Sequence, residues 1–467
     1  MSRLLIRAAL ALMLTIPVWA QLDLAPLAAE YRAAEAASKG GWGESASADS
    51  GTLGWGEGAL LQDYAAMWEA TADVYWLEKI ARHFDRIMAN ASDPDGDGFL
   101  SWQTKSYSSA VAFAERLSNV SDAKIAPEQQ KNTNGAAAAK CEGHTYLIEF
   151  QTGPAHFRIR DRNSGRVLAD NVAYQSGAKI TQIEPFRFSI SGQPHQGDRF
   201  LIRTIAPEAL EYAVHQGMFV YPVAVFIEAV KTRPALQPKF GADAERFLAF
   251  VLRHVFEKNE EDWLDLGESG GYRFMPRITD RMPNRIMPHN QYATLARTWL
   301  VLKDVPGVPP LVGRRAAQMV RFFHDHLELD AAHDAYRWYY SDWIEYGQTQ
   351  RSRFEDTSHA CLNVCLAIEA SRRGVLFNDA ELRRIANTWL AVMWNQDSAN
   401  PQMAAAVDGR KPYTFSALTS GWTQLSQWDR RVYELAGKAF QAGEKKKRWQ
   451  HIPELLLSAK RAGVLTP

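Results

Sequence analysis

Residues 287–304 read MPHNQYATLARTWLVLKD, where a proline-containing loop runs into apolar residues spaced three and four apart. That spacing predicts an amphipathic helix. His289, Asn290 and Tyr292 fall at the predicted helix start, where the first backbone N–H groups lack partners and an Asn side chain can cap them. A capped helix explains Asn290 by itself, whereas three hydrogen-bonding side chains together also fit the mouth of a functional site. The sequence leaves both interpretations open.

The same apolar spacing recurs in pairs of segments, and each pair predicts a helical hairpin. We expect the hairpins to stand in a ring, with the first helices inside and their N-termini opening at one end. The predicted fold class is therefore mainly α, an incomplete (α/α) toroid of helical hairpins with a small antiparallel β insert. The paired segments are 59–73 with 74–91, 217–231 with 243–258, 291–304 with 312–329, and 358–374 with 378–395, and a partial hairpin begins at 420.

A different pattern separates the first two hairpins. Residues 132–140, NTNGAAAAK, predict a mobile loop. Residues 141–206 alternate apolar and polar side chains between Gly, Asn and Pro turns, which predicts short antiparallel strands. The segment FSISGQPHQGDRFLIR within them resembles a β segment of flagellar hook-associated and other exported proteins. The predicted domains are a signal peptide at 1–20, the first part of the helical ring at 21–140, a β insert at 141–206 and the rest of the ring at 207–467.

The N-terminus predicts export. Arg3 and Arg7 precede an apolar run too short to cross a bilayer, and the run ends in the small residue Ala20, as a cleavage site requires. We expect cleavage after Ala20 and a periplasmic or secreted protein. No later stretch approaches the roughly 20 unbroken apolar residues of a membrane helix, so we expect no membrane span.

The composition predicts a large globular core and disfavours nucleic acid as a partner. The chain has 467 residues, of which 46% are hydrophobic, and its 53 basic and 53 acidic side chains create no net field that would attract a polyanion. The three cysteines are too few, and odd in number, for a disulfide scaffold. The composition does not indicate an oligomeric state.

Three histidines open predicted first helices: His215 in HQG, His289 in PHNQY and His359 in EDTSH. A single histidine at a helix start is more often structural than catalytic. If the ring forms, however, the three imidazoles approach one cavity, and buried polar groups in such numbers need a reason. Arg285 precedes His289 and reaches the same space. Asp356 can simply cap its helix, or else Glu355 or Asp356 orients His359 or acts as a general acid.

Two aromatic segments predict a ligand-binding groove. GWGEG places Trp55 beside Glu57 between glycines that permit close backbone approach, a combination suited to stacking on a sugar and bonding its hydroxyls. A later loop carries Trp343 and Tyr346 among other rings, with Arg353 to receive a carboxylate. Core packing would claim about half of these rings. The remainder would form the groove.

Residues 93–98, DPDGDG, predict either a calcium site or a plain acidic turn. Asp93, Asp95 and Asp97 alternate as at the front of a calcium loop, but the twelfth position is Thr104, where an EF-hand has a bidentate Glu. A structural calcium is the only metal that the sequence suggests, and we expect that no cofactor is required.

The hairpins, together with GWGEG, HQG, PHNQY and EDTSH, resemble the α/α-toroid carbohydrate-active proteins, which include polysaccharide lyases, unsaturated glucuronyl hydrolases and uronyl epimerases. The resemblance covers residues about 40–105 and 207–440. It implies an exported lyase that cleaves a uronic-acid-containing polysaccharide by β-elimination. That reaction requires donors that neutralise the sugar carboxylate before a base can act. The NNH run of some alginate lyases is absent here.

The resemblance also implies roles for individual residues. Tyr292 would shuttle the proton, and His215 and His289 would serve as base partner and orienter. Asn290 and Arg285 would contact the sugar carboxylate. The predicted catalytic set also includes His359, and the predicted substrate-binding set is Trp55, Glu57, Trp343, Tyr346, Arg353 and Asp356.

Two alternatives remain open from the sequence. The first is a glycoside hydrolase that uses two carboxylates about 5–10 Å apart, drawn from Glu57, Asp342, Glu355 and Asp356. The second is a non-catalytic glycan-binding protein, in which the aromatic groove remains and the polar cluster is only structural.

Overall fold

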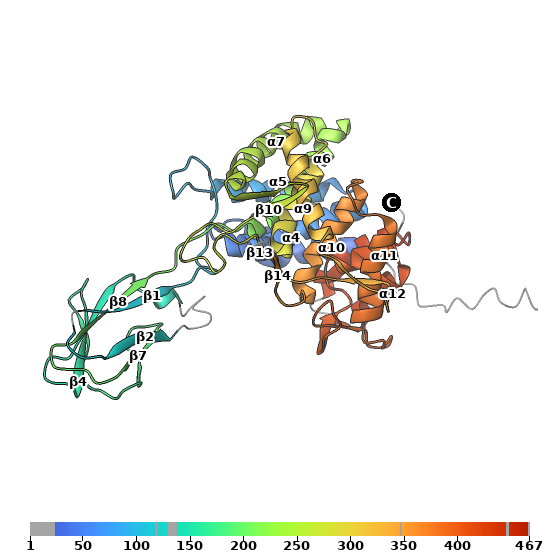
Figure 1. The fold of residues 1–467 in the computed structure, drawn as a ribbon. Helices are drawn as coiled ribbons and strands as arrows, with labels where there is room; N and C mark the ends of the chain where they lie inside the picture. The colour runs from blue at the N-terminus through green and yellow to red at the C-terminus, as the bar shows by residue number, and fades with distance from the viewer. Residues whose placement is uncertain (1–23, 118, 129–137, 346–347, 445–447, 466–467) are drawn as a thin grey trace, which may run out of the picture.

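The computed structural model describes residues 24–117, 119–128, 138–345, 348–444 and 448–465. It consists of a helical body and a β insert that projects from it as a separate lobe (Figure 1). The predicted signal peptide lies outside the described residues, and so does most of the predicted mobile loop. The last residues of that loop, Ala138–Lys140, form the short 3-10 helix η3.

Helices occupy the four paired segments of the helical body because each has an apolar face to bury. Each second helix packs against its first, and α12 and α13 follow at the C-terminal end. The bounds are α4 Gly58–Thr71 and α5 Val74–Ala89, α6 Ala213–Thr232 and α7 Gln237–Val251, α8 His289–Leu302 and α9 Pro310–His324, α10 Thr357–Arg372 and α11 Asp379–Asn387, α12 Arg430–Ala442 and α13 Ile452–Arg461. Before them lie α2 Leu27–Ala37, the 3-10 helix η1 Ser38–Gly41, the short α3 Ser50–Thr52 and the π-helical turn η2 Leu53–Glu57.

The first helices pack side by side in chain order. Helix α4 contacts α6, α6 contacts α8, and α8 contacts α10, while α13 contacts both α4 and the 3-10 segment η8 Trp422–Gln427. Gly217 permits the closest of these approaches, because a Cβ at this position would lie 2.2 Å from Thr294 Oγ1. The starts of α6 and α8 are therefore held together by backbone packing.

Helix α6 is the one described helix that is long and apolar enough to cross a membrane. Most of it is buried between α4 and α8, so its apolar surface is already used within the protein. Length and composition alone are weak evidence for a membrane span.

The β insert contains two antiparallel sheets around a core of its own. The five-stranded sheet has the order β1-β8-β3-β4-β5, and the three-stranded sheet has the order β2-β7-β6. Phe150, Phe157 and Phe188 belong to this separate core. The strands are β1 Val111–Arg116, β2 Lys124–Glu128, β3 Thr145–Glu149, β4 His156–Asp161, β5 Val167–Ala173, β6 Lys179–Ile180, β7 Arg187–Ser191 and β8 Arg199–Ile205.

The insert begins earlier than residue 141, where the sequence placed its boundary. Strand β1 pairs with β8, and β2 pairs with β7, so both earlier strands belong to the insert. Their sequences, VAFAER and KIAPE, lie in a region rich in small and polar residues. Their strand conformation comes from long-range pairing, which local alternation of side chains does not reveal.

Short β-hairpins also occupy the connections of the helical body. They are β9 Trp263–Leu266 with β10 Ser269–Tyr272, β11 Glu328–Asp330 with β12 Ala335–Arg337, β13 Asp342–Glu345 with β14 Gln348–Arg351, and β15 Gln402–Ala404 with β16 Tyr413–Ser416. With the two sheets of the insert they make the chain a mixed α+β protein. The predicted class, a mainly α incomplete toroid, is therefore wrong. Helical periodicity identified the paired helices, but the hairpin strands of the body, three or four residues long, left too little periodicity to count.

Candidate functional site

A chain of three buried side chains lies at the start of α8. His289 Nε2 is 2.7 Å from Asp342 Oδ2, and His289 Nδ1 is 2.5 Å from the Tyr292 hydroxyl. All three side chains are buried. A carboxylate only accepts hydrogen bonds, so the imidazole donates from Nε2, and its Nδ1 then accepts from the phenol. The phenolic proton of Tyr292 thus points toward an imidazole that Asp342 orients.

Local structure brings these three residues together. Helix α8 follows the extended residue Pro288, and His289 N donates to Tyr340 O at 3.1 Å. Tyr292 lies three residues after His289, which puts both side chains on one face of the helix. Asp342 begins β13, and Arg351 in the register partner β14 approaches its other oxygen, with Nε 3.3 Å from Oδ1.

Burial determines the protonation of His289 and Tyr292. Removal from water lowers the pKa of His289 below its usual value, although Asp342 acts in the opposite direction. Burial, with the negative charges of Asp342 and Glu355, holds the pKa of Tyr292 well above its usual value. The imidazole and the phenol are therefore both neutral at neutral pH.

Glu355 is a buried carboxyl group without a hydrogen-bond partner for either oxygen in the described part of the chain. Burial, followed by the neighbouring charge of Asp356, raises its pKa well above the usual range, which favours the protonated form of this carboxyl group. The segment that carries Asp342 also holds Glu355, whose N donates to Trp338 O at 3.0 Å. Because Glu355 also perturbs Tyr292, we refer to Tyr292, His289, Asp342 and Glu355 together as the helix-start site.

Asp356 and His359 lie beside this site at the start of α10. Asp356 is the N-cap, and its Oδ1 accepts from His359 N at 3.1 Å. Its Oδ2 is 2.6 Å from His359 Nδ1. Burial opposes ionisation of Asp356, but the hydrogen bonds from His359 and Ser358 outweigh it and hold its pKa well below the usual value. The His359 ring is part-exposed and lies 5.7 Å from the Tyr340 ring.

Asn290 is not the N-cap that its position suggested. The helix begins at His289 after Pro288, which offers no side-chain cap, and Asn290 lies inside the first turn. Its Oδ1 is buried without a partner among the described residues. Pro288 thus occupies the N-cap position two residues before Asn290, the expected cap.

His215 stands apart from the helix-start site. Its Nδ1 is 3.1 Å from Ser50 Oγ, and its ring packs against Trp55 and Tyr107. Burial lowers its pKa to about 4, so the ring is neutral at neutral pH. Within the described residues, no hydrogen bond, ion pair or ring contact joins His215 to His289 or His359. A single pocket for the three histidines remains a prediction.

The other predicted residues have separate surroundings. Glu57 is buried and bonded to His83 Nδ1 at 2.5 Å and to Glu44 N at 2.6 Å, which accounts for it structurally. Trp55 is partly exposed and donates to Tyr107. Arg285 lies over the Trp343 ring at 4.6 Å, and Arg353 is exposed beside Asp356 at 3.4 Å. Tyr346 lies outside the described residues.

The carboxylates of Asp93, Asp95 and Asp97 offer ligand atoms within 4.8 Å of one another. Asp93 already accepts backbone N–H groups of its own turn, and Lys258 pairs with both Asp97 and Asp95. These bonds fit the acidic-turn interpretation, and calcium stays a prediction. Two further clusters, Glu142 with His144 and Asp161 and Glu355 with Asp356 and His359, also offer three ligand atoms each.

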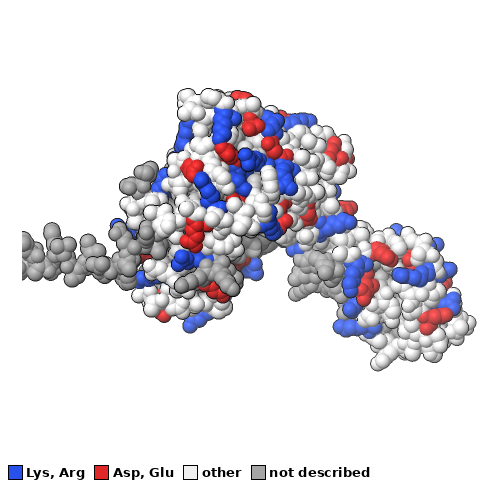
Figure 2. All heavy atoms as spheres, turned by 180° about the vertical axis from the view of Figure 1, so that it is seen from behind, with Lys and Arg blue, Asp and Glu red and all other residues white. Residues whose placement is uncertain are grey.

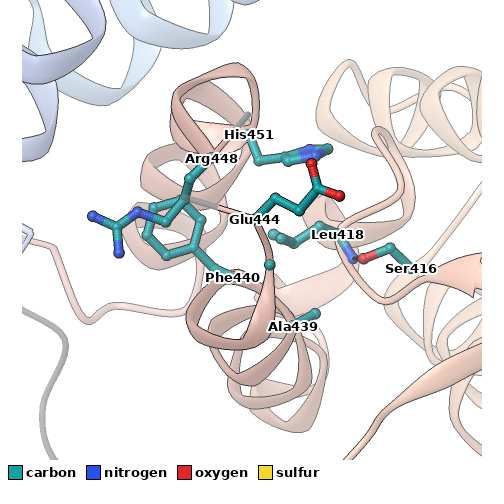
Figure 3. A pocket seen from close by; sticks show the side chains of 8 residues that line it. Ser416, Leu418, Ala439, Phe440, Glu444, Arg448 and His451 are labelled. Atoms are coloured by element: carbon teal, nitrogen blue, oxygen red, sulfur yellow. Dashed lines mark hydrogen bonds between the residues drawn. The ribbon is translucent and has the colours of Figure 1, made fainter. Parts of the chain in front are cut away.

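Two cavities lie away from the helix-start site. One of about 170 Å³ is lined by residues of α12 and the segments around it, where Glu444 points toward His451 and Arg448 lies beside Phe440 (Figure 3). A larger one of about 440 Å³ lies at the C-terminal ends of α4, α6 and α10. Acidic and basic side chains are mixed over the face seen in Figure 2, in agreement with a chain of no net charge.

No family model and no curated protein matches the chain. Among solved structures, similarity is found to FlgL of Xanthomonas campestris, at 13% identity over 54% of this chain and 86% of that chain, with a TM-score of 0.16. Similarity is also found to the flagellar junction protein FlgL of Legionella pneumophila, at 12% identity over 54% of this chain and 94% of that chain, with a TM-score of 0.17. TM-scores this low carry no argument about fold or function.

The resemblance to α/α-toroid carbohydrate-active proteins is wrong. No family model matches the chain, and its described residues form a mixed α+β protein in place of the predicted toroid. The predicted polysaccharide lyase, with its hydrolase and glycan-binding alternatives, depended on that resemblance and is wrong with it. Paired amphipathic helices occur in many unrelated proteins, so their spacing identified helices without identifying a family.

Proposed function

We propose that the helical body is an enzyme that moves protons at the helix-start site. The buried chain of Asp342, His289 and Tyr292 is the observation that carries this proposal. A substrate proton passes to the Tyr292 oxygen while the phenolic proton passes to His289 Nδ1. Asp342 then stabilises the imidazolium through Nε2–H. A neutral phenol and a neutral imidazole are the starting states that this transfer requires.

Glu355 supplies the opposite function of proton donor. A buried carboxyl without a partner costs about 1–3 kcal/mol, and such groups are rare without a functional reason. Its raised pKa favours the protonated form, which can donate a proton. Enzymes that catalyse proton transfer commonly hold one accepting group and one donating group in environments that separate their pKa values. Tyr292 with His289 would be the accepting group, and Glu355 would be the donating group.

The substrate that we propose is a small polar molecule with several hydrogen-bonding groups. Several buried polar atoms without partners among the described residues belong to residues at or just before the starts of α6 and α8, two helices that pack against each other. They are the Tyr212 hydroxyl, His215 Nε2, Gln216 Nε2 and Asn290 Oδ1. Buried donors and acceptors of this kind gain most when a ligand supplies the missing bonds.

The test is turnover of a polar metabolite extract, followed by mass spectrometry. Wild-type protein should consume at least one compound, and Tyr292→Phe and Asp342→Asn should each lower the rate by more than a hundredfold. Tyr64→Phe is the matched control. Tyr64, on α4, is also a buried tyrosine, and its hydroxyl donates to Glu35 Oε1 at 2.5 Å. An extract unchanged by the wild type, or consumed equally by Tyr292→Phe, would contradict the proposal.

A further inference from the structure

The larger cavity, of about 440 Å³, is independent of the helix-start site. Its lining residue Glu369 follows His359 by ten positions on α10, a rise of about 15 Å along the helix. The volume falls within the roughly 300–1,000 Å³ typical of small-molecule sites. One wall is apolar, formed by Val225, Ala229 and Val301, and the other is strongly charged.

The three acidic side chains of the cavity are already neutralised. Glu69 lies 3.2 Å from Arg372 and 3.0 Å from Arg461, which approaches from behind the lining. Glu228 Oε2 accepts from Arg373 at 2.9 Å. Glu369 accepts from Arg373 at 2.8 Å and from the Tyr221 hydroxyl at 3.2 Å. These carboxylates therefore contribute little free negative charge to the cavity.

Two of the four lining cations remain without a carboxylate. Arg233 lies at the end of α6 with its guanidinium over the Trp68 ring, 4.9 Å from the centroid, and no hydrogen bond or ion pair in the described part of the chain occupies it. Lys460 donates to the backbone carbonyl of Glu69 and has no acidic side chain as a partner among the described residues. The cavity consequently has an excess of positive charge.

We propose that this cavity binds a small organic anion, with a carboxylate or phosphate group held by Arg233 and Lys460. Trp68 holds the face of the guanidinium, so the N–H groups at its edge are preorganised for a bidentate anion. The apolar part of the ligand lies against Val225 and Val301. The site needs both features, because the charge selects the anion and the apolar wall favours an organic group over an inorganic ion.

Titration calorimetry of the full-length protein at low ionic strength tests this proposal. Phenyl phosphate, benzoate or both should bind, whereas the neutral benzyl alcohol should bind at least tenfold more weakly. If phenyl phosphate binds more tightly, the acidic group of the ligand is a phosphate; if benzoate binds more tightly, it is a carboxylate. Binding should weaken when salt is added, because the attraction is partly electrostatic.

Arg233→Met keeps the packing on Trp68 but removes the charge, and it should weaken anion binding at least tenfold. Lys460→Met provides a second test if the first variant does not fold. Arg86→Met is the matched control, because Arg86 also covers a tryptophan, Trp42, at 4.5 Å but lies outside the cavity. Absence of anion binding, equal binding of benzyl alcohol, or unchanged binding in both cavity variants would overturn the proposal. Because no turnover is measured, the result is independent of the helix-start site.

Discussion

Glu211 makes the stability of the protein depend on pH in a direction that can be calculated. It lies directly before α6, and its Oε1 accepts from Ser101 Oγ at 2.7 Å. Burial raises its pKa from 4.5 to about 7, with a further contribution from the charge of Asp95. A carboxyl whose pKa is raised in the folded state stabilises that state below its unfolded pKa and loses the contribution as the pH rises through its folded pKa.

One unit of pKa corresponds to about 1.36 kcal/mol. Raising the pKa of Glu211 from 4.5 to about 7 therefore makes the full loss of folding free energy about 3.4 kcal/mol. Between pH 5 and pH 8 the loss is about 2.5 kcal/mol. Glu211→Gln retains an oxygen for Ser101 and removes the titration. Its free energy of unfolding relative to wild type should therefore rise by about 2.5 kcal/mol over that range. Other titrating groups are common to both proteins and cancel in the difference.

Urea unfolding, followed by circular dichroism at pH 5, 6.5 and 8, measures this difference. The helical signal should be used, because the helical body and the β insert have separate cores and need not unfold together. A difference between Glu211→Gln and wild type that stays constant from pH 5 to pH 8 would refute the reasoning. It would mean that Glu211 ionises in the folded protein as easily as in the unfolded chain.

Two further predictions concern packing at the helix starts. Tyr292→Phe leaves His289 Nδ1 buried without a donor and should destabilise the protein by about 1–3 kcal/mol. Tyr64→Phe should destabilise it by only about 0.5–1.5 kcal/mol, because Glu35 retains other partners. Equal losses in the two variants, measured by urea unfolding, would count against the hydrogen-bonded chain. Gly217→Ala forces a Cβ against Thr294 and should destabilise the protein by at least about 1–3 kcal/mol. Gly437→Ala, which has open space around it on α12, should instead stabilise the protein by about 0.5–1 kcal/mol. A melting temperature that rises in both glycine variants would disprove the close approach of α6 and α8.

Helical periodicity was enough to predict the four helix pairs of the body, from α4 to α11, but not α2 or α13. The segment predicted as a helix from 291 to 304 forms α8 from His289 to Leu302, because its apolar residues recur with helical spacing and pack on both sides. The helix start was predicted less well. Pro288 occupies the N-cap position in place of Asn290, so the helix begins at His289, two residues earlier than predicted.

Long-range contacts of the helix-start site were not predictable from spacing. His289 and Tyr292 were chosen from the sequence, and they do lie together. Asp342 is 53 residues away from His289, and its place depends on how β13 pairs with β14. The sequence suggested Asp342 only as a carboxylate for a hydrolase. It suggested Glu355 as such a carboxylate, as a residue that orients His359, or as a general acid. Neither the oriented imidazole nor the absence of partners for Glu355 follows from a linear pattern.

The pairing of β1 with β8 also bears on how the helical body assembles. These strands are the first and last of the insert, and Val111 lies opposite Ile205. Once the insert has folded, the two ends are held within about 5 Å of each other, the spacing of paired strands. Folding of the insert has then already brought these two ends together, so most of the entropic cost of closing the long loop between α5 and α6 does not arise again when the helices dock. Only residues 90–110 and 206–212 then separate α5 and α6 outside the insert, so we expect the interruption to slow the docking of α6 against α4 little.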